Sequence, residues 1–252
     1  MVFTKPFIIF NLALVSMMIF GSCNTTRRLE KALANPKGVT KLNLSYGSLN
    51  ELPAEISTLT ELEELILFKN QISSLPPEIG QLSKLRKLVV SSNNLKTIPP
   101  EISQLTNLEH LSLKFNEIDS LPPEIGSLAN LDYLDLSYNR IEKLPPEIGM
   151  LKNLEFLYLG QNQLYEIPPE IGQLERLRHL YIGRNFLTFL PFEIGNLRNL
   201  NELDIAGSGP LLDVPESISN LRSLDIIYID QTTVLPYSIH LLRNRTMIII
   251  KF

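Results

Sequence analysis

Hydrophobic residues recur along most of this 252-residue chain at an interval of 23 positions, and the pattern begins at Val39. Successive units start at Val39, Leu62, Leu85, Leu108, Leu131, Leu154, Leu177 and Leu200. A ninth unit starts at Leu224 after a one-residue insertion, and a partial tenth unit starts at Arg245. Repetition of this kind is typical of solenoids, because each unit covers the apolar face that its neighbour leaves open.

Each unit contains a segment in which leucines alternate with other residues, as Leu134 and Leu136 do. Alternation with period two predicts a short strand whose leucines all face one side of a sheet. Because the strands recur at one interval, we expect them to stack in parallel. A proline then marks a bend, and the motif E-I-x-x-L predicts a short helical turn. The pattern therefore predicts an α/β repeat solenoid.

An asparagine follows the predicted strand in six successive units. The six are Asn70, Asn93, Asn116, Asn139, Asn162 and Asn185. Repetition at one position favours a shared structural role, in which each side-chain amide bonds to backbone groups that the turning chain leaves buried. We therefore expect an asparagine ladder along the core. The alternative is that these are solvated turn residues.

One unit shows the whole motif L-x-x-L-x-L-x-x-N-x-L-x-x-L-P-x-E-I-x-x-L, with Leu131, Leu134, Leu136, Asn139, Ile141, Leu144, Pro145, Glu147, Ile148 and Leu151. This motif resembles the leucine-rich repeat family, specifically the 23-residue type with the L-P-x-E-I-G-x-L signature found in bacterial proteins. The resemblance implies a horseshoe with a parallel concave sheet and short helical or 3-10 turns on the convex side. It covers residues 39–252, for which we expect about nine full units and a C-terminal capping strand.

The first 22 residues have the pattern of a signal peptide. Lys5 precedes an apolar run over residues 8–20, which is shorter than the about 20 residues that a membrane-spanning helix needs. Gly21 and Ser22 then lead into Cys23, the only cysteine of the chain.

This arrangement resembles the bacterial lipoprotein signal, with Phe20 in a position where that family usually has an aliphatic residue. The resemblance implies cleavage before Cys23 and attachment of palmitate or a similar acyl chain to its sulfur. Residues 23–38 would then form a lipid-anchored tether and N-terminal cap. We expect a membrane-anchored lipoprotein of the bacterial cell envelope, on the periplasmic or surface-exposed side. The alternative is an ordinary signal peptide.

Composition limits the chemistry that such a solenoid can carry. A single cysteine excludes a disulfide scaffold and a four-cysteine metal site. Acidic residues outnumber basic ones 27 to 23, which argues against a nucleic-acid partner. His110 and His179 are three repeats apart, roughly 14 Å in a parallel sheet, which is too far for one metal ion. No phosphate-binding or dinucleotide-binding motif occurs, so we expect no metal and no cofactor.

Residues that alternate with the strand leucines face the other side of the predicted sheet, and the repeat does not dictate them. Nine of these are our candidate partner-binding residues: Tyr133, Asp135, Phe156, Tyr158, His179, Tyr181, Glu202, Asp204 and Tyr228. Tyrosine combines a large contact area with a polar tip, which favours binding hot spots. The alternative is that the rings only stabilise the sheet by stacking across strands. We predict a concave patch that recognises a protein or glycan.

An enzymatic interpretation rests on His110, Ser112 and Asp135, which nominally make a Ser-His-Asp set on adjacent strands. A regular sheet offers no sharp nucleophile turn and no pair of backbone donors for an oxyanion, so we expect no catalysis. We therefore predict non-enzymatic recognition of a macromolecular partner at the cell envelope. A structural spacer or scaffold without a specific ligand is the main alternative, and a hydrolase is a further one. The oligomeric state does not follow from the pattern.

Overall fold

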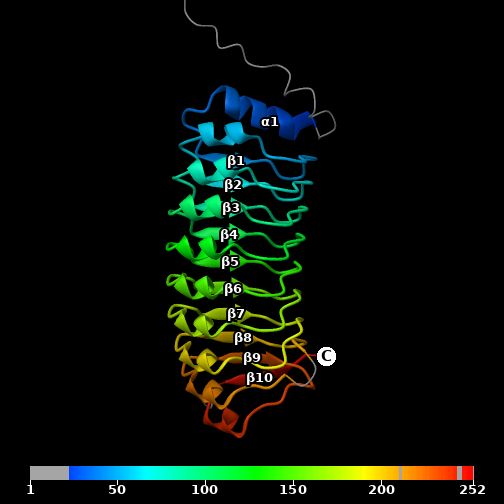
Figure 1. The fold of residues 1–252 in the computed structure, drawn as a ribbon, viewed down its shortest axis with the longest axis vertical. Coiled ribbons are helices and arrows are strands. Elements are labelled where there is room, and N and C mark those ends of the chain that lie inside the picture. The colour runs from blue at the N-terminus through cyan, green and yellow to red at the C-terminus, as the bar shows by residue number, and fades with distance from the viewer. Residues whose placement is uncertain (1–22, 210–211, 243–245, 252) are drawn as a thin grey trace, which may run out of the picture.

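The computed structural model describes residues 23–209, 212–242 and 246–251 (Figure 1). The predicted signal peptide, residues 1–22, lies outside the described residues, and so does the side chain of Cys23. Within the described part of the chain, no helix is both long and apolar enough to cross a membrane.

Ten short parallel strands form one sheet, in the order of the sequence. They are β1 (Lys41–Asn43), β2 (Glu64–Ile66), β3 (Lys87–Val89), β4 (His110–Ser112), β5 (Tyr133–Asp135), β6 (Phe156–Tyr158), β7 (His179–Tyr181), β8 (Glu202–Asp204), β9 (Ile226–Ile229) and β10 (Met247–Ile250). Each strand pairs with the next without a shift, so that Leu134 lies between Leu111 and Leu157. The predicted parallel solenoid is confirmed, and we number each unit by its strand.

A 3-10 helix follows each of the first nine strands within the described residues. These helices are η2 (Ala54–Thr58), η3 (Pro77–Gln81), η4 (Pro100–Gln104), η5 (Pro123–Ser127), η6 (Pro146–Met150), η7 (Pro169–Gln173), η8 (Phe192–Asn196), η9 (Glu216–Asn220) and η10 (Tyr237–Leu241). A proline in extended conformation precedes each one, as Pro145 does with φ −67° and ψ 145°. Proline suits this position because its fixed φ fits the extended conformation and it has no N–H that would need an acceptor. Figure 1 shows the helices stacked in a column beside the strands.

Leucine and isoleucine side chains from every unit fill the space between the strands and the 3-10 helices. In unit five Leu134, Leu136 and Ile148 have no exposed surface, and the same positions are buried in the neighbouring units. Burial of one such side chain stabilises the fold by about 1.5–3 kcal/mol. Because each layer is covered by the next, the units depend on their neighbours for this stabilisation.

The six asparagines lie in one row at the carboxyl ends of the strands and are buried. Asn139 donates from Nδ2 to the carbonyl oxygens of Leu113 (3.1 Å) and Leu136 (2.9 Å), and its Oδ1 accepts from the N–H of Ile118 at 3.1 Å. The same bonds recur at Asn70, Asn93, Asn116, Asn162 and Asn185. Ser208 occupies this position in unit eight and donates to Ile182. Each side chain thus joins two successive turns of the solenoid.

The two ends of the solenoid differ. Helix α1 (Cys23–Ala34) lies over the first unit, with Leu29 and Ala32 buried against the core (Figure 1). At the other end β10 covers unit nine, where Ile227 is buried, but Met247–Ile250 are themselves exposed.

Candidate functional site

The nine candidate binding residues lie on strands β5 to β9 and alternate with buried residues, so they share the concave face of the sheet. The register places residues of one column side by side. Tyr158 lies beside Asp135 and Tyr181, and Phe156 lies beside Tyr133 and His179. The parallel register therefore brings together residues that are 23 positions apart in the chain.

Aromatic rings on this face contact one another across four strands. His110 stacks on Tyr133 with ring centroids 4.1 Å apart, and Phe156 stacks on His179 at 4.8 Å. In the adjacent column Tyr158 stacks on Tyr181 at 4.9 Å. Tyr133 connects the two columns, since its ring lies 6.1 Å from Phe156 and 5.4 Å from Tyr158. We call these six rings the aromatic surface. All six are only partly buried.

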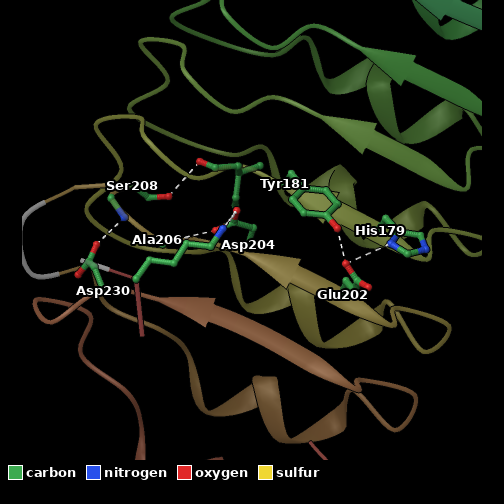
Figure 2. Close-up of polar contacts among 10 residues, drawn as sticks. His179, Tyr181, Glu202, Asp204, Ala206, Ser208 and Asp230 are labelled. Atoms are coloured by element: carbon green, nitrogen blue, oxygen red, sulfur yellow. Dashed lines mark hydrogen bonds and ion pairs between the residues drawn. The ribbon is translucent and has the colours of Figure 1, made fainter. Parts of the chain in front are cut away.

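Polar groups end the aromatic surface on unit eight (Figure 2). The Tyr181 hydroxyl donates to the Glu202 carboxylate, and His179 Nδ1 lies 3.6 Å from Glu202 Oε2. Burial, and then the hydrogen bond and negative charge of Glu202, raise the pKa of Tyr181 above its ordinary value. Burial, with the charge of Asp135, raises the pKa of Tyr133 to about 12. Both tyrosines are therefore neutral at physiological pH.

Lys251 joins the end of the chain to the candidate residues of units eight and nine. Its Nζ lies 2.6 Å from Asp204 Oδ2 and 4.1 Å from the centroid of the Tyr228 ring. The contact pairs the Asp204 carboxylate with a cation of the same chain. Asp204 therefore presents a neutralised carboxylate to any partner.

Two of the candidate acids also hold the local backbone. Asp135 Oδ1 accepts a hydrogen bond from the Ser137 N–H at 3.0 Å, and Asp204 Oδ1 accepts one from Ala206 at 3.1 Å. Asp135 is 6% exposed and so offers little surface to a partner. Their positions two residues before these N–H groups are typical of aspartate in turns, a role that we did not assign from the sequence.

The nominal Ser-His-Asp residues have separate partners. The Ser112 hydroxyl is hydrogen-bonded to that of Ser91 at 2.7 Å, and Asp135 accepts from a backbone N–H. His110 stacks on Tyr133, and burial, together with the charge of Lys87, lowers its pKa to about 4. These contacts give each residue a structural role.

A hollow of about 560 Å³ lies beside the tyrosines, where the strands of units five to nine end. Its floor follows Gly160, Gly183 and Ala206, which occupy one position of units six to eight. Tyr158 and Tyr181 come two residues before Gly160 and Gly183 in the sequence, and both tyrosines also line the hollow. We call it the glycine groove.

Earlier units have larger residues at the floor position, among them Phe68 and Lys114. A Cβ on Gly183 would lie only 2.6 Å from the carbonyl oxygen of Ala206, so this position requires glycine. Sequence reasoning missed the groove. Its signal was the run of small residues at one position of successive units.

The far side of the groove is formed by residues in left-handed backbone conformation. Among the residues that the structure describes, seven non-glycine residues have φ near +60°: Tyr46, Lys69, Ser92, Phe115, Tyr138, Gln161 and Arg184. Each precedes the ladder position, and the turn into the ladder imposes this conformation at a cost of about 1 kcal/mol or more per residue. Tyr138 stacks on Phe115 at 4.2 Å and remains exposed. Residue type did not predict this row, because tyrosine, phenylalanine and lysine rarely adopt positive φ.

Metal binding finds no support in the described residues, where no group of three or more His, Cys, Asp or Glu side chains is placed to hold an ion.

Two family models match the chain. The model described as "Leucine-rich repeat region" matches residues 114–204, and the model described as "Leucine rich repeat" matches residues 60–118 and 83–141. A comparison with curated proteins finds no match.

Several solved structures are similar to this chain. An LRR protein of Leptospira interrogans is 31% identical with a TM-score of 0.54, over 88% of this chain and 74% of that one. The LRR ectodomain of the Arabidopsis thaliana receptor kinase GASSHO1/SCHENGEN3, in complex with Casparian strip integrity factor 2, is 35% identical with a TM-score of 0.67. That match covers 79% of this chain but only 25% of the ectodomain. Internalin C2 of Listeria monocytogenes shares the fold, at 22% identity and a TM-score of 0.68, over 81% of this chain and 92% of that one.

Proposed function

Because the chain belongs to the leucine-rich repeat family, we propose that it is a non-enzymatic recognition protein that binds a protein partner through the concave face of units five to nine. The observation that carries this proposal is the aromatic surface. Its rings are packed in defined positions yet remain partly exposed. Rings already held in place lose little conformational freedom when a partner covers them, so their burial contributes more of its free energy to affinity.

The comparisons support a binding role without identifying the partner. The Arabidopsis thaliana ectodomain, 35% identical, is in complex with Casparian strip integrity factor 2. Polar groups around the aromatic surface, such as Glu202, would select partners with complementary groups rather than provide most of the affinity.

We further propose that Cys23 carries the lipid that holds the protein at a bacterial envelope membrane. Helix α1 begins at Cys23, so the anchor would lie at the N-terminal end of the solenoid (Figure 1). Four strand spacings, roughly 19 Å, separate β1 from β5. The binding face would therefore stand clear of the bilayer surface. Two acyl chains would give stable attachment, whereas a single chain gives only marginal binding.

The partner-binding proposal is tested by crosslinking in the native envelope, followed by recovery of the tagged full chain. The test variant carries Tyr133→Ala and Phe156→Ala, and the matched control carries Glu64→Ala and Lys87→Ala at the same strand position of units two and three. We expect partner recovery to fall roughly tenfold or more in the test variant only, as loss of two anchoring rings implies. Equal recovery of every protein by both variants would instead favour a structural spacer.

The anchor is tested separately by labelling cells with a palmitate analogue. We expect the wild type to carry label and to fractionate with membranes, and Cys23→Ala to lose both properties. A Cys23→Ala protein that is still labelled and still membrane-bound would contradict the proposed anchor. It would not bear on the proposal of partner binding.

A further inference from the structure

In two units of the glycine groove, units five and eight, an aspartate side chain caps a backbone donor. Asp135 accepts from the N–H of Ser137 in unit five, and Asp204 accepts from the N–H of Ala206 in unit eight. The capping oxygen comes from two residues earlier in the same unit. These N–H groups are therefore satisfied within the protein.

Units six and seven lack this cap, because Tyr158 and Tyr181 occupy the aspartate position. Among the described residues, the N–H groups of Gly160 and Gly183 have no hydrogen-bond acceptor. Units two to four also lack the cap, but there a larger residue such as Phe68 occupies the floor position. Glycine places no side chain beside the N–H, and both glycines line the hollow. The groove thus has two available donors about one strand spacing, roughly 4.8 Å, apart.

Arg184 adds a third donor group to the same hollow. It follows Gly183 directly, lines the groove and is exposed. Its guanidinium has no ion-pair or hydrogen-bond partner in the part of the chain that the structure describes. Arginine can form two parallel hydrogen bonds to one carboxylate.

The acidic groups of the groove are already engaged. Asp204 is paired with Lys251 at 2.6 Å. Asp230 accepts from the N–H of Gly207 at 2.5 Å and of Thr232 at 2.7 Å. Although burial acts in the opposite direction, the hydrogen bond from the Thr232 hydroxyl, together with these backbone bonds, holds the pKa of Asp230 below its ordinary value, so it stays charged and bonded. Because these donors are free and the two carboxylates of the groove are engaged, the groove favours a ligand that supplies acceptors.

The shape of the groove indicates a linear ligand. It is lined by residues of every unit from Ser137 in unit five to Asp230 in unit nine. Four strand spacings, roughly 19 Å, correspond to about six residues of extended polypeptide at about 3.3 Å per residue. An extended chain also offers a row of carbonyl acceptors, which a compact anion does not.

We propose that the glycine groove binds an extended acidic segment of the protein partner. A ligand carboxylate pairs with Arg184, ligand carbonyl groups accept from Gly160 and Gly183, and Tyr158 and Tyr181 contact the apolar parts of the segment. This inference rests on the proposed function, since it specifies which part of the partner enters the concave face.

The test uses the full chain and a random library of N-acetylated, C-amidated peptides of about seven residues, in which side chains are the only carboxylates. We expect enriched peptides to contain Asp or Glu, and to bind roughly tenfold more weakly when that residue is replaced by its amide.

Two groove variants have matched controls at the same repeat position. Gly160→Phe fills the floor with the side chain that unit two has at Phe68, and its control is Ser45→Phe in unit one. Arg184→Gln removes the free cation, and its control is Lys69→Gln in unit two. We expect the groove variants to bind the enriched peptide roughly tenfold more weakly, and the controls to bind it as the wild type does.

Three results would overturn the inference. Enriched peptides could lack acidic residues, both groove variants could bind them normally, or Gly160→Phe could abolish binding to a glycan array while no peptide is enriched. Crosslinking and recovery of the native partner with each variant shows whether the groove inference or the proposed function has failed. Loss in the Tyr133→Ala, Phe156→Ala variant with normal recovery by Gly160→Phe contradicts the groove alone, whereas equal recovery by all variants contradicts both.

Discussion

The first four units and the next four share one backbone but have different concave faces. In units one to three, Glu64 lies between Lys41 at 3.1 Å and Lys87 at 3.9 Å, so ion pairs cross the strands. In units six and seven the same strand position carries stacked rings, Phe156 on His179. Strand register and asparagine bonds are the same in both regions. The scaffold therefore does not dictate the outward residues. The residues at a few outward positions distinguish a solvated face from the proposed binding face.

The difference is also energetic. Exposed ion pairs contribute about 0–1 kcal/mol each because water and salt screen them. Aromatic pairs contribute about 0.5–1.5 kcal/mol beyond the area that they bury. The second region thus holds stacked rings across successive strands, where the first region has ion pairs between β1, β2 and β3.

The largest effects should come from the ladder and be equal in the two regions. We expect Asn93→Ala and Asn139→Ala each to lower the free energy of unfolding by about 2–4 kcal/mol, because each removes three buried hydrogen bonds and leaves one N–H, that of Ile72 or Ile118, without a partner. The carbonyl groups keep a hydrogen bond from a neighbouring asparagine of the ladder. Urea unfolding measures both. A clearly larger loss at one site would show that the two regions do not share one scaffold.

Glycine substitutions sharpen the comparison within the second region. Gly183→Ala should cost about 1–3 kcal/mol, because the new Cβ would lie 2.6 Å from the Ala206 carbonyl oxygen. Gly160→Ala should cost under about 1 kcal/mol, since the nearest atom is 3.2 Å away. The midpoints of thermal unfolding measure the difference. Equal losses would contradict the distinct packing of the two floor positions.

Acid should destabilise the boundary between the regions, where His110 stacks on Tyr133. The folded pKa of His110 is about 4, against about 6.5 in the unfolded chain. Its contribution is therefore complete above about pH 6.5 and is lost as the pH falls toward 4. Because the ring is only half-buried, we expect about 1 kcal/mol. Urea unfolding at pH 7 and 4.5 should show this loss in the wild type relative to His110→Asn; identical pH profiles would contradict it.

The smallest effect should come from the ion pairs of the first region. Glu64→Gln should change the free energy of unfolding by at most about 0.5 kcal/mol, and less at high salt. Urea unfolding in low and high salt measures it. A loss as large as that of an aromatic pair would remove the energetic contrast between the regions.

Sequence reasoning predicted the fold well because burial enforces it. A strand leucine such as Leu134 can be buried only if it aligns with Leu111 and Leu157, so the 23-residue interval determines the register. The same interval placed Tyr158 beside Tyr181 on one face. It did not predict the backbone-capping role of Asp135, because that role depends on where the N–H of Ser137 points after the strand ends.

By itself, the sequence determined the repeat, the parallel sheet and the set of outward residues, since these follow from periodic burial of apolar side chains. Tertiary structure alone decided which outward groups meet across the columns and beyond the strands. The diagonal contact of Tyr133 with Tyr158, the pairing of Lys251 with Asp204 and the open floor at Gly160 and Gly183 do not follow from the interval. They depend on side-chain rotamers and on the path of the chain after each strand, which local packing determines.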